Sequence, residues 1–246
     1  NSLERDVERE VLSTYGKQLT QDDHRARVEF LLWTNQRTAA SKLKYLLTSD
    51  YRKLVDARIA LAARSRNVDA LVDAVPANLQ DNPGLLYERA KWRRQKLRNQ
   101  DVATPLLTGI DGNDIPEAGR SRLWDERNIA IRTDLKDGNW SRAYQLASPH
   151  GMESGGDFAE AEWLAGWIAL RFLDDAKVAL DHFVTMYGAV KYPVSRARGA
   201  YWVARAMQAL GETDEARGWH HLAARHPTTY YGQLSIARLR PGASLK

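Results

Sequence analysis

The chain has 246 residues, of which 43% are hydrophobic and 27% charged, with a formal net charge of +5 and a pI near 9.4. This length allows one or two globular domains, or one solenoid of about six helical hairpins. Cysteine is absent, which excludes disulfides and thiol chemistry, and no run of 18 apolar residues occurs, so no membrane span is expected.

The first part of the sequence predicts short amphipathic helices arranged in hairpins. Val7, Val11 and Tyr15 recur at intervals of four in the first helix, and Asp50 is expected to cap the fourth. Pro76 ends a short helix, and Pro83 begins a longer one. The helices expected here span 3–18, 22–33, 38–47, 50–62, 67–75, 83–97 and 101–107.

Glycine and proline then cluster in 108–119, the longest loop that the sequence predicts. We expect one superhelical domain over 1–246, with a front half (1–108), a loop (109–119) and a back half (120–240). In the back half, Asp157, either Asp174 or Asp175, and the Pro227–Thr229 segment are expected to begin helices. The helices expected there span 120–136 and 139–147, then one that begins at 157, one from 174 or 175 to about 188, and finally 193–210, 212–226 and 230–239.

The back half repeats itself every 39 residues. Trp124, Trp163 and Trp202 are spaced by 39, and twenty residues after each of them comes Tyr144, Phe183 or Leu222. A fixed period of this size with helical patterning is typical of a helical-hairpin solenoid. The predicted fold is therefore all-α, a right-handed α-superhelix (solenoid) of hairpins similar to tetratricopeptide repeats.

The repeated tryptophans are interpreted as core residues packed between the helices of each hairpin. The alternative is stacking on sugar rings, which aromatic faces can bind. One or two of the tryptophans that break the repeat could be exposed on a groove. These are Trp33, Trp92, Trp140, Trp167 and Trp219.

Several runs resemble the superhelical region of the soluble lytic murein transglycosylases. They are Pro83–Arg94, Glu160–Leu173, Gly199–Ala206, Ala209–Glu212 and Arg225–Leu234. The most specific part is the Tyr-Gly-Gln-Leu sequence that ends the last run, and the resemblance extends over nearly the whole chain.

The resemblance implies an α-superhelix that precedes a lysozyme-like catalytic domain in the bacterial periplasm. That domain cleaves the bond between N-acetylmuramic acid and N-acetylglucosamine and leaves a 1,6-anhydro product, while the superhelix helps to hold the glycan strand and brace the enzyme. The implied partners are peptidoglycan glycan strands and the catalytic domain, which is expected beyond residue 246, with any signal peptide removed or outside this chain.

No catalytic residue is predicted in this chain. Glu153 is followed by Ser154, as the family's catalytic glutamate is followed by serine, but the pair lies in a glycine-rich stretch and no Gly-Leu-Met-Gln sequence follows. The chain by itself is therefore expected to be inactive. The alternative is an adaptor, similar to tetratricopeptide proteins, that binds a peptide or protein in its concave groove without any enzymatic activity.

Arginines are the candidate ligand-binding residues, through the carboxylates of peptidoglycan stem peptides or an acidic face of the catalytic domain. A solvated helix face is the alternative, and nucleic acid is not expected because the positive charge is interleaved with acidic residues. The candidates are Arg93, Arg94, Arg196, Arg198 and Arg205.

Neither a metal site nor a cofactor site is predicted. His220 and His221 are adjacent and therefore point apart on a helix, while His182 and His221, which are one repeat apart, lack further ligands.

Overall fold

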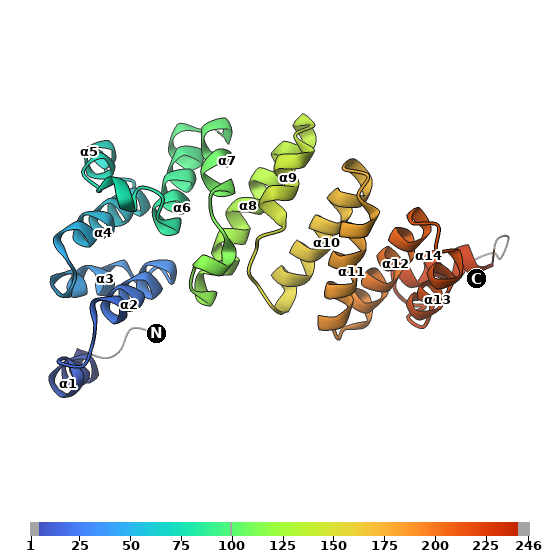
Figure 1. Cartoon of the computed structure of the whole chain (residues 1–246), viewed down its shortest axis with the longest axis horizontal. Helices are drawn as coiled ribbons and strands as arrows, with labels where there is room; N and C mark the ends of the chain where they lie inside the picture. The colour runs from blue at the N-terminus through green and yellow to red at the C-terminus, as the bar shows by residue number, and fades with distance from the viewer. Residues whose placement is uncertain (1–4, 99, 241–246) are drawn as a thin grey trace. The chain divides into compact units, whose positions relative to one another are not determined.

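A computed structural model describes residues 5–98 and 100–240 of the chain (Figure 1). All regular structure in these residues is helical, which confirms the predicted all-α class. The chain forms two compact units, Asn1–Glu126 and Arg127–Lys246. It passes from the first to the second inside the long helix α8 (Glu117–Asp137). Residues 3 and 4 of the first expected helix lie outside the described part.

The first unit contains short helices, as the sequence predicts. Brief 3-10 or π turns, labelled η, lie in some of the connections between successive α-helices. The elements are α1 (Arg5–Tyr15), α2 (Gln21–Trp33), α3 (Arg37–Leu43), η1 (Lys44–Leu46), α4 (Ser49–Ala62), α5 (Val68–Asp73), η2 (Ala77–Leu79), α6 (Pro83–Trp92), η3 (Arg93–Leu97), α7 (Gln100–Thr108), η4 (Gly112–Asp114) and the first part of α8.

The core of the first unit lies among α2, α4 and α6, which contact one another. Leu31, Leu54 and Leu85 are fully buried there, as is the indole of Trp33. Hydrophobic burial of this kind is the main favourable term in folding, so helices that would be marginal in isolation are stable here.

The predicted loop 108–119 is instead part of the first unit's packing. Ile110 and Ile115 are buried, and α8 begins at Glu117, ahead of the expected start at 120. Gly119 lies inside α8 against Trp33, where an added Cβ would stand 2.7 Å from the indole ring. Glycine at this position therefore allows α8 to pack closely against Trp33 of α2, whereas the sequence pattern indicated a loop.

The second unit is built from longer helices that follow one another side by side (Figure 1). Contacts join α10 to α11, α11 to α12, α12 to α13 and α13 to α14, and α12 also touches α10 and α14. The elements are the last part of α8, α9 (Trp140–Ala147), α10 (Gly155–Phe172), α11 (Ala176–Ala189), α12 (Pro193–Ala209), α13 (Thr213–Ala224) and α14 (Tyr230–Leu239).

Residues at equivalent repeat positions meet in the core of this unit. The rings of Trp163 and Trp202 lie 6.2 Å apart, and Phe183 lies 5.7 Å from Trp202. Trp124, which belongs to the first unit, is buried as well. Trp140 is the exposed member of the series at 41%, with its ring stacked on Phe172.

Two of the predicted helix caps are confirmed and two are wrong. Asp175 and Thr229 accept hydrogen bonds from the backbone N–H groups of Val178 and Gly232, as N-cap side chains do. Thr48 caps α4 in place of Asp50. Asp157 lies in the first turn of α10, where a negative charge is favoured by the helix dipole.

Candidate functional site

The arginines predicted to bind ligand are engaged within the protein. Arg94 donates from Nε and Nη2 to the two carboxylate oxygens of Glu126, at 2.7 and 2.8 Å. This hydrogen bonding raises the pKa of Arg94, and Glu126 is itself buried. The pair therefore joins η3 to α8.

Arg93 is half-buried beside a cavity of about 100 Å³, which Asp69 and Asp73 also line.

The three candidate arginines of α12 contact aromatic residues. Arg196 lies 3.8 Å above the ring of Tyr187 and donates to its hydroxyl at 2.6 Å. Arg198 lies over Trp163, and its burial lowers its pKa. Arg205 donates to the hydroxyl of Tyr201, one turn earlier on α12, at 3.3 Å. Arg196 and Arg198 thus fasten α12 to α11 and α10, respectively.

The five candidate arginines are divided between the two units. Arg93 and Arg94 belong to η3 in the first unit, whereas Arg196, Arg198 and Arg205 belong to α12 in the second. Charge density along the sequence does not distinguish a cation that faces solvent from one that lies against an aromatic ring.

A hydrogen-bonded cluster that sequence reasoning missed lies inside the second unit. Its centre is the buried carboxylate of Glu162 on α10, whose Oε1 lies 2.9 Å from Nε2 of His150 and whose Oε2 lies 2.6 Å from Nδ1 of His182. The chain of contacts continues to the hydroxyl of Tyr144, 3.0 Å from Nε2 of His182. One carboxylate thus connects α9, α10, α11 and the segment before α10.

The partners of each ring determine the protonation of this cluster. The backbone N–H of Met152 donates to Nδ1 of His150, so that ring is neutral and donates through Nε2. His182 donates to the carboxylate through Nδ1, and its Nε2 accepts from Tyr144 when neutral or donates to it when charged. Burial raises the pKa of Glu162, but the hydrogen bonds from both histidines outweigh burial and hold it below its ordinary value.

The cluster connects four segments of the second unit. Both oxygens of the Glu162 carboxylate have a histidine partner, and the Tyr144 hydroxyl at the end of the cluster is hydrogen-bonded to Nε2 of His182. Its sequence signal is a single charged residue between alanines on the apolar face of α10, where Ala161 and Ala165 are also buried. Within residues 5–98 and 100–240, no group of three acidic, histidine or cysteine side chains is placed to hold a metal ion.

A buried ion pair occupies a similar place in the first unit. Arg58 on α4 is 1% exposed and donates from Nη1 to Oε2 of Glu29 on α2 at 2.5 Å. Tyr51 donates its hydroxyl to the other oxygen of Glu29 at 2.6 Å, and burial beside this carboxylate raises the pKa of Tyr51. Charges removed from water to this degree require partners, and Gly84 on α6 leaves the space in which the guanidinium lies.

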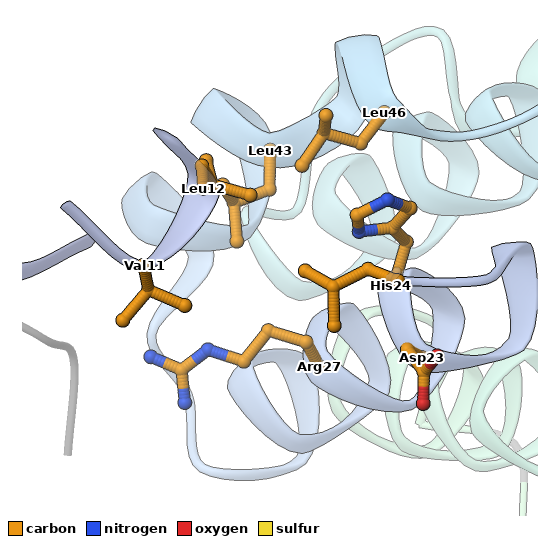
Figure 2. Close-up of a pocket in the computed structure, with 8 residues that line it drawn as sticks. Val11, Leu12, Asp23, His24, Arg27, Leu43 and Leu46 are labelled. Carbon is orange, nitrogen blue, oxygen red and sulfur yellow. The ribbon is translucent and has the colours of Figure 1, made fainter. Parts of the chain in front are cut away.

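An apolar cavity of about 190 Å³ separates α1 from α2 and the α3–η1 segment. Figure 2 shows Val11 and Leu12 of α1 together with Leu43 and Leu46 around it, and the Arg27 side chain extending toward Val11. Most of the lining is apolar, and its polar side chains, those of Asp23, His24 and Arg27, belong to α2.

A second cavity of about 200 Å³ in the first unit is polar and rich in cations; we call it the basic pocket. It lies where α2, α4 and α6 end, and Asn35 and Arg64 line it from the left-handed positions that follow α2 and α4. Its lining residues are Asn35, Arg37, Leu61, Ala62, Arg64, Glu88, Lys91, Trp92, Gln95 and Arg122.

Glu153 has the surroundings of an ordinary surface residue. It is exposed in the irregular segment before α10, whereas a general acid is typically held in a buried pocket. None of the helices in the described residues combines the length and apolar character needed to cross a membrane.

The comparisons with known proteins add no relative from which a function could be transferred. No protein-family model, no curated protein and no solved structure matches the chain. The fold and the sites therefore define an all-helical protein with two buried ionic clusters and a basic pocket.

Proposed function

We propose that this chain is the non-catalytic superhelical scaffold of a periplasmic lytic transglycosylase, which helps to hold peptidoglycan glycan strands and braces a lysozyme-like catalytic domain. The proposal rests on the sequence runs that resemble the superhelical region of that family. The proposal also includes a specific architecture for the chain, which is a right-handed solenoid of hairpins similar to tetratricopeptide repeats.

The observation that carries the proposal is the packing of the resembling runs against one another in the second unit. Tyr231, in the Tyr-Gly-Gln-Leu sequence on α14, lies 5.3 Å from the ring of Tyr201 on α12. Trp202, from the same run of α12, contacts Trp163 of α10. Each run thus supports the next, as expected for a stack in which neighbouring hairpins stabilise one another.

A scaffold of this kind needs rigidity more than reactive groups, and the second unit has features that provide it. The Glu162 cluster and the arginine–aromatic contacts of α12 join neighbouring helices through their side chains. Function would then reside in surfaces, with the bond cleavage performed by the separate catalytic domain.

Co-sedimentation of the purified chain with intact peptidoglycan sacculi, at low and at physiological salt, tests the proposal. We expect pelleting that weakens as salt rises, because a basic chain would contact an anionic wall mainly through charge. We also expect no release of 1,6-anhydro muropeptides by the chain alone. Failure to pellet at both salts would contradict the glycan-holding role and favour the protein-binding adaptor.

A further inference from the structure

The basic pocket carries more positive charge than its own residues neutralise. Four cationic side chains line it, those of Arg37, Arg64, Lys91 and Arg122, against one carboxylate, that of Glu88. Burial raises the pKa of Glu88, against the opposing effect of the surrounding cations. A single acid, itself costly to ionise where it is buried, leaves the pocket with excess positive charge.

The four cations differ in the hydrogen bonds that they already make within the protein. Arg122 donates to the backbone carbonyl of Trp33 at 2.8 Å. Lys91 donates to the hydroxyl of Tyr87 at 3.0 Å and is paired with Oε1 of Glu126 at 3.8 Å. Arg64 donates to Oε1 of Gln95 at 2.6 Å. In the described part of the chain, Arg37 makes no hydrogen bond or ion pair and acts on Glu88 only through its charge. The Arg37 guanidinium therefore keeps its donors for a ligand.

The arrangement of the helices indicates which anion suits the pocket. It lies at the C-terminal ends of α2, α4 and α6, whose carbonyl groups carry partial negative charge. Phosphate sites are commonly built on helix N-termini, where backbone N–H groups point at the ligand. Each carboxylate group of a ligand carries a single charge and meets less repulsion from carbonyl ends than a phosphate group does, and its two oxygens match the planar fork of a guanidinium.

We propose that the basic pocket binds a small carboxylate ligand, with Arg37 as its principal contact and Arg64 as a second. The amide groups of Asn35 and Gln95 lie beside these cations and supply neutral donors and acceptors for the rest of a polar ligand. This site lies in the first unit and is independent of the scaffold role proposed above.

Isothermal titration of the whole chain with glutarate, in a buffer without phosphate, tests the proposal. Glutaramide, the uncharged diamide, and inorganic phosphate are titrated in parallel. Arg37→Gln is expected to weaken glutarate binding about tenfold or more, because a hydrogen bond between charged groups is lost. Arg66→Gln removes the same charge from an exposed position outside the pocket and is expected to leave the affinity unchanged.

Two further variants extend the test if Arg37→Gln fails to fold. Arg64→Gln alters an exposed side chain and should weaken glutarate binding as well. Glu88→Gln removes the competing carboxylate and should strengthen it. Equal binding of glutaramide and glutarate, equal affinities of the Arg37 and Arg66 variants, or binding of phosphate without glutarate would each overturn the proposal.

Discussion

Oε2 of Glu162 lies 2.6 Å from Nδ1 of His182, while the other oxygen of the same carboxylate lies 2.9 Å from Nε2 of His150. Through these two contacts one side chain of α10 joins α11 and the segment that enters α10. Because the carboxylate is removed from water, its contacts are stronger than they would be at the surface, and their loss is more costly.

Replacing Glu162 by glutamine is expected to destabilise the protein by about 3 kcal/mol. An amide has one acceptor oxygen, so its NH₂ group would face a histidine nitrogen that also donates, and a buried donor would be left unsatisfied. The free energy of unfolding in urea measures this change. Glu160→Gln, on the same helix but 41% exposed at its side chain, is the matched control and should cost less than about 1 kcal/mol.

His220 is expected to make stability depend on pH between 6.5 and 4. Burial, together with the charges of Arg238 and Arg205, lowers the pKa of His220 to about 4. Because the unfolded chain binds a proton at higher pH than the folded one, the folded state loses stability as pH falls from 6.5 toward 4. The loss amounts to about 3 kcal/mol.

Unfolding free energies at pH 7 and pH 4.5 measure this effect, and His220→Gln should remove most of the difference that His220 causes. His221→Gln is the matched control, because the neighbouring histidine is exposed. A pH difference that is equal in the two variants would show that His220 is not the responsible group.

Gly84→Ala is expected to destabilise the first unit by about 2 kcal/mol or more. An added Cβ would stand 2.0 Å from the guanidinium carbon of Arg58, which is buried and bonded to Glu29. The arginine would have to shift from its ion pair or strain α6. Thermal unfolding followed by circular dichroism measures the loss.

The same substitution at Gly218 should act in the opposite direction. An added Cβ at this position in α13 meets nothing within 4 Å. Alanine should therefore raise stability by about 0.5–1 kcal/mol through helix propensity alone. Destabilisation by both substitutions to a similar extent would refute the close contact at Gly84.

Trp202→Ala is expected to cost about 3–5 kcal/mol, because its ring contacts Trp163, Phe183 and Tyr231 and a cavity would remain. Trp140→Ala, at the exposed tryptophan, should cost about 1 kcal/mol, the order of its stacking on Phe172. Urea unfolding of both variants distinguishes core packing from surface roles. Weaker sedimentation with sacculi only for the stable Trp140 variant would indicate sugar stacking there.

The helices were predictable because their signals are local. Apolar periodicity, capping residues such as Thr229 and the prolines at 83 and 193 act within one or two turns, and the structure forms helices in these segments. The 39-residue spacing likewise identified Trp163 and Trp202, which meet in the core. The errors arose where a local signal has two meanings, as at Gly119, whose role is set by the distant Trp33.

The sites could not be predicted because the partners of their side chains are distant in the sequence. The local pattern of residues predicts an all-α fold with a repeated core, and the composition shows that the chain is basic and contains many arginines. Only the packing of the helices decided that Arg94 is neutralised by Glu126 while Arg37 keeps its donors, and that Glu162 holds two histidines twelve and twenty residues away. The sequence specifies which side chains are charged. Whether a charge is neutralised within the protein or available to a ligand depends on burial and on partners that folding brings from distant segments.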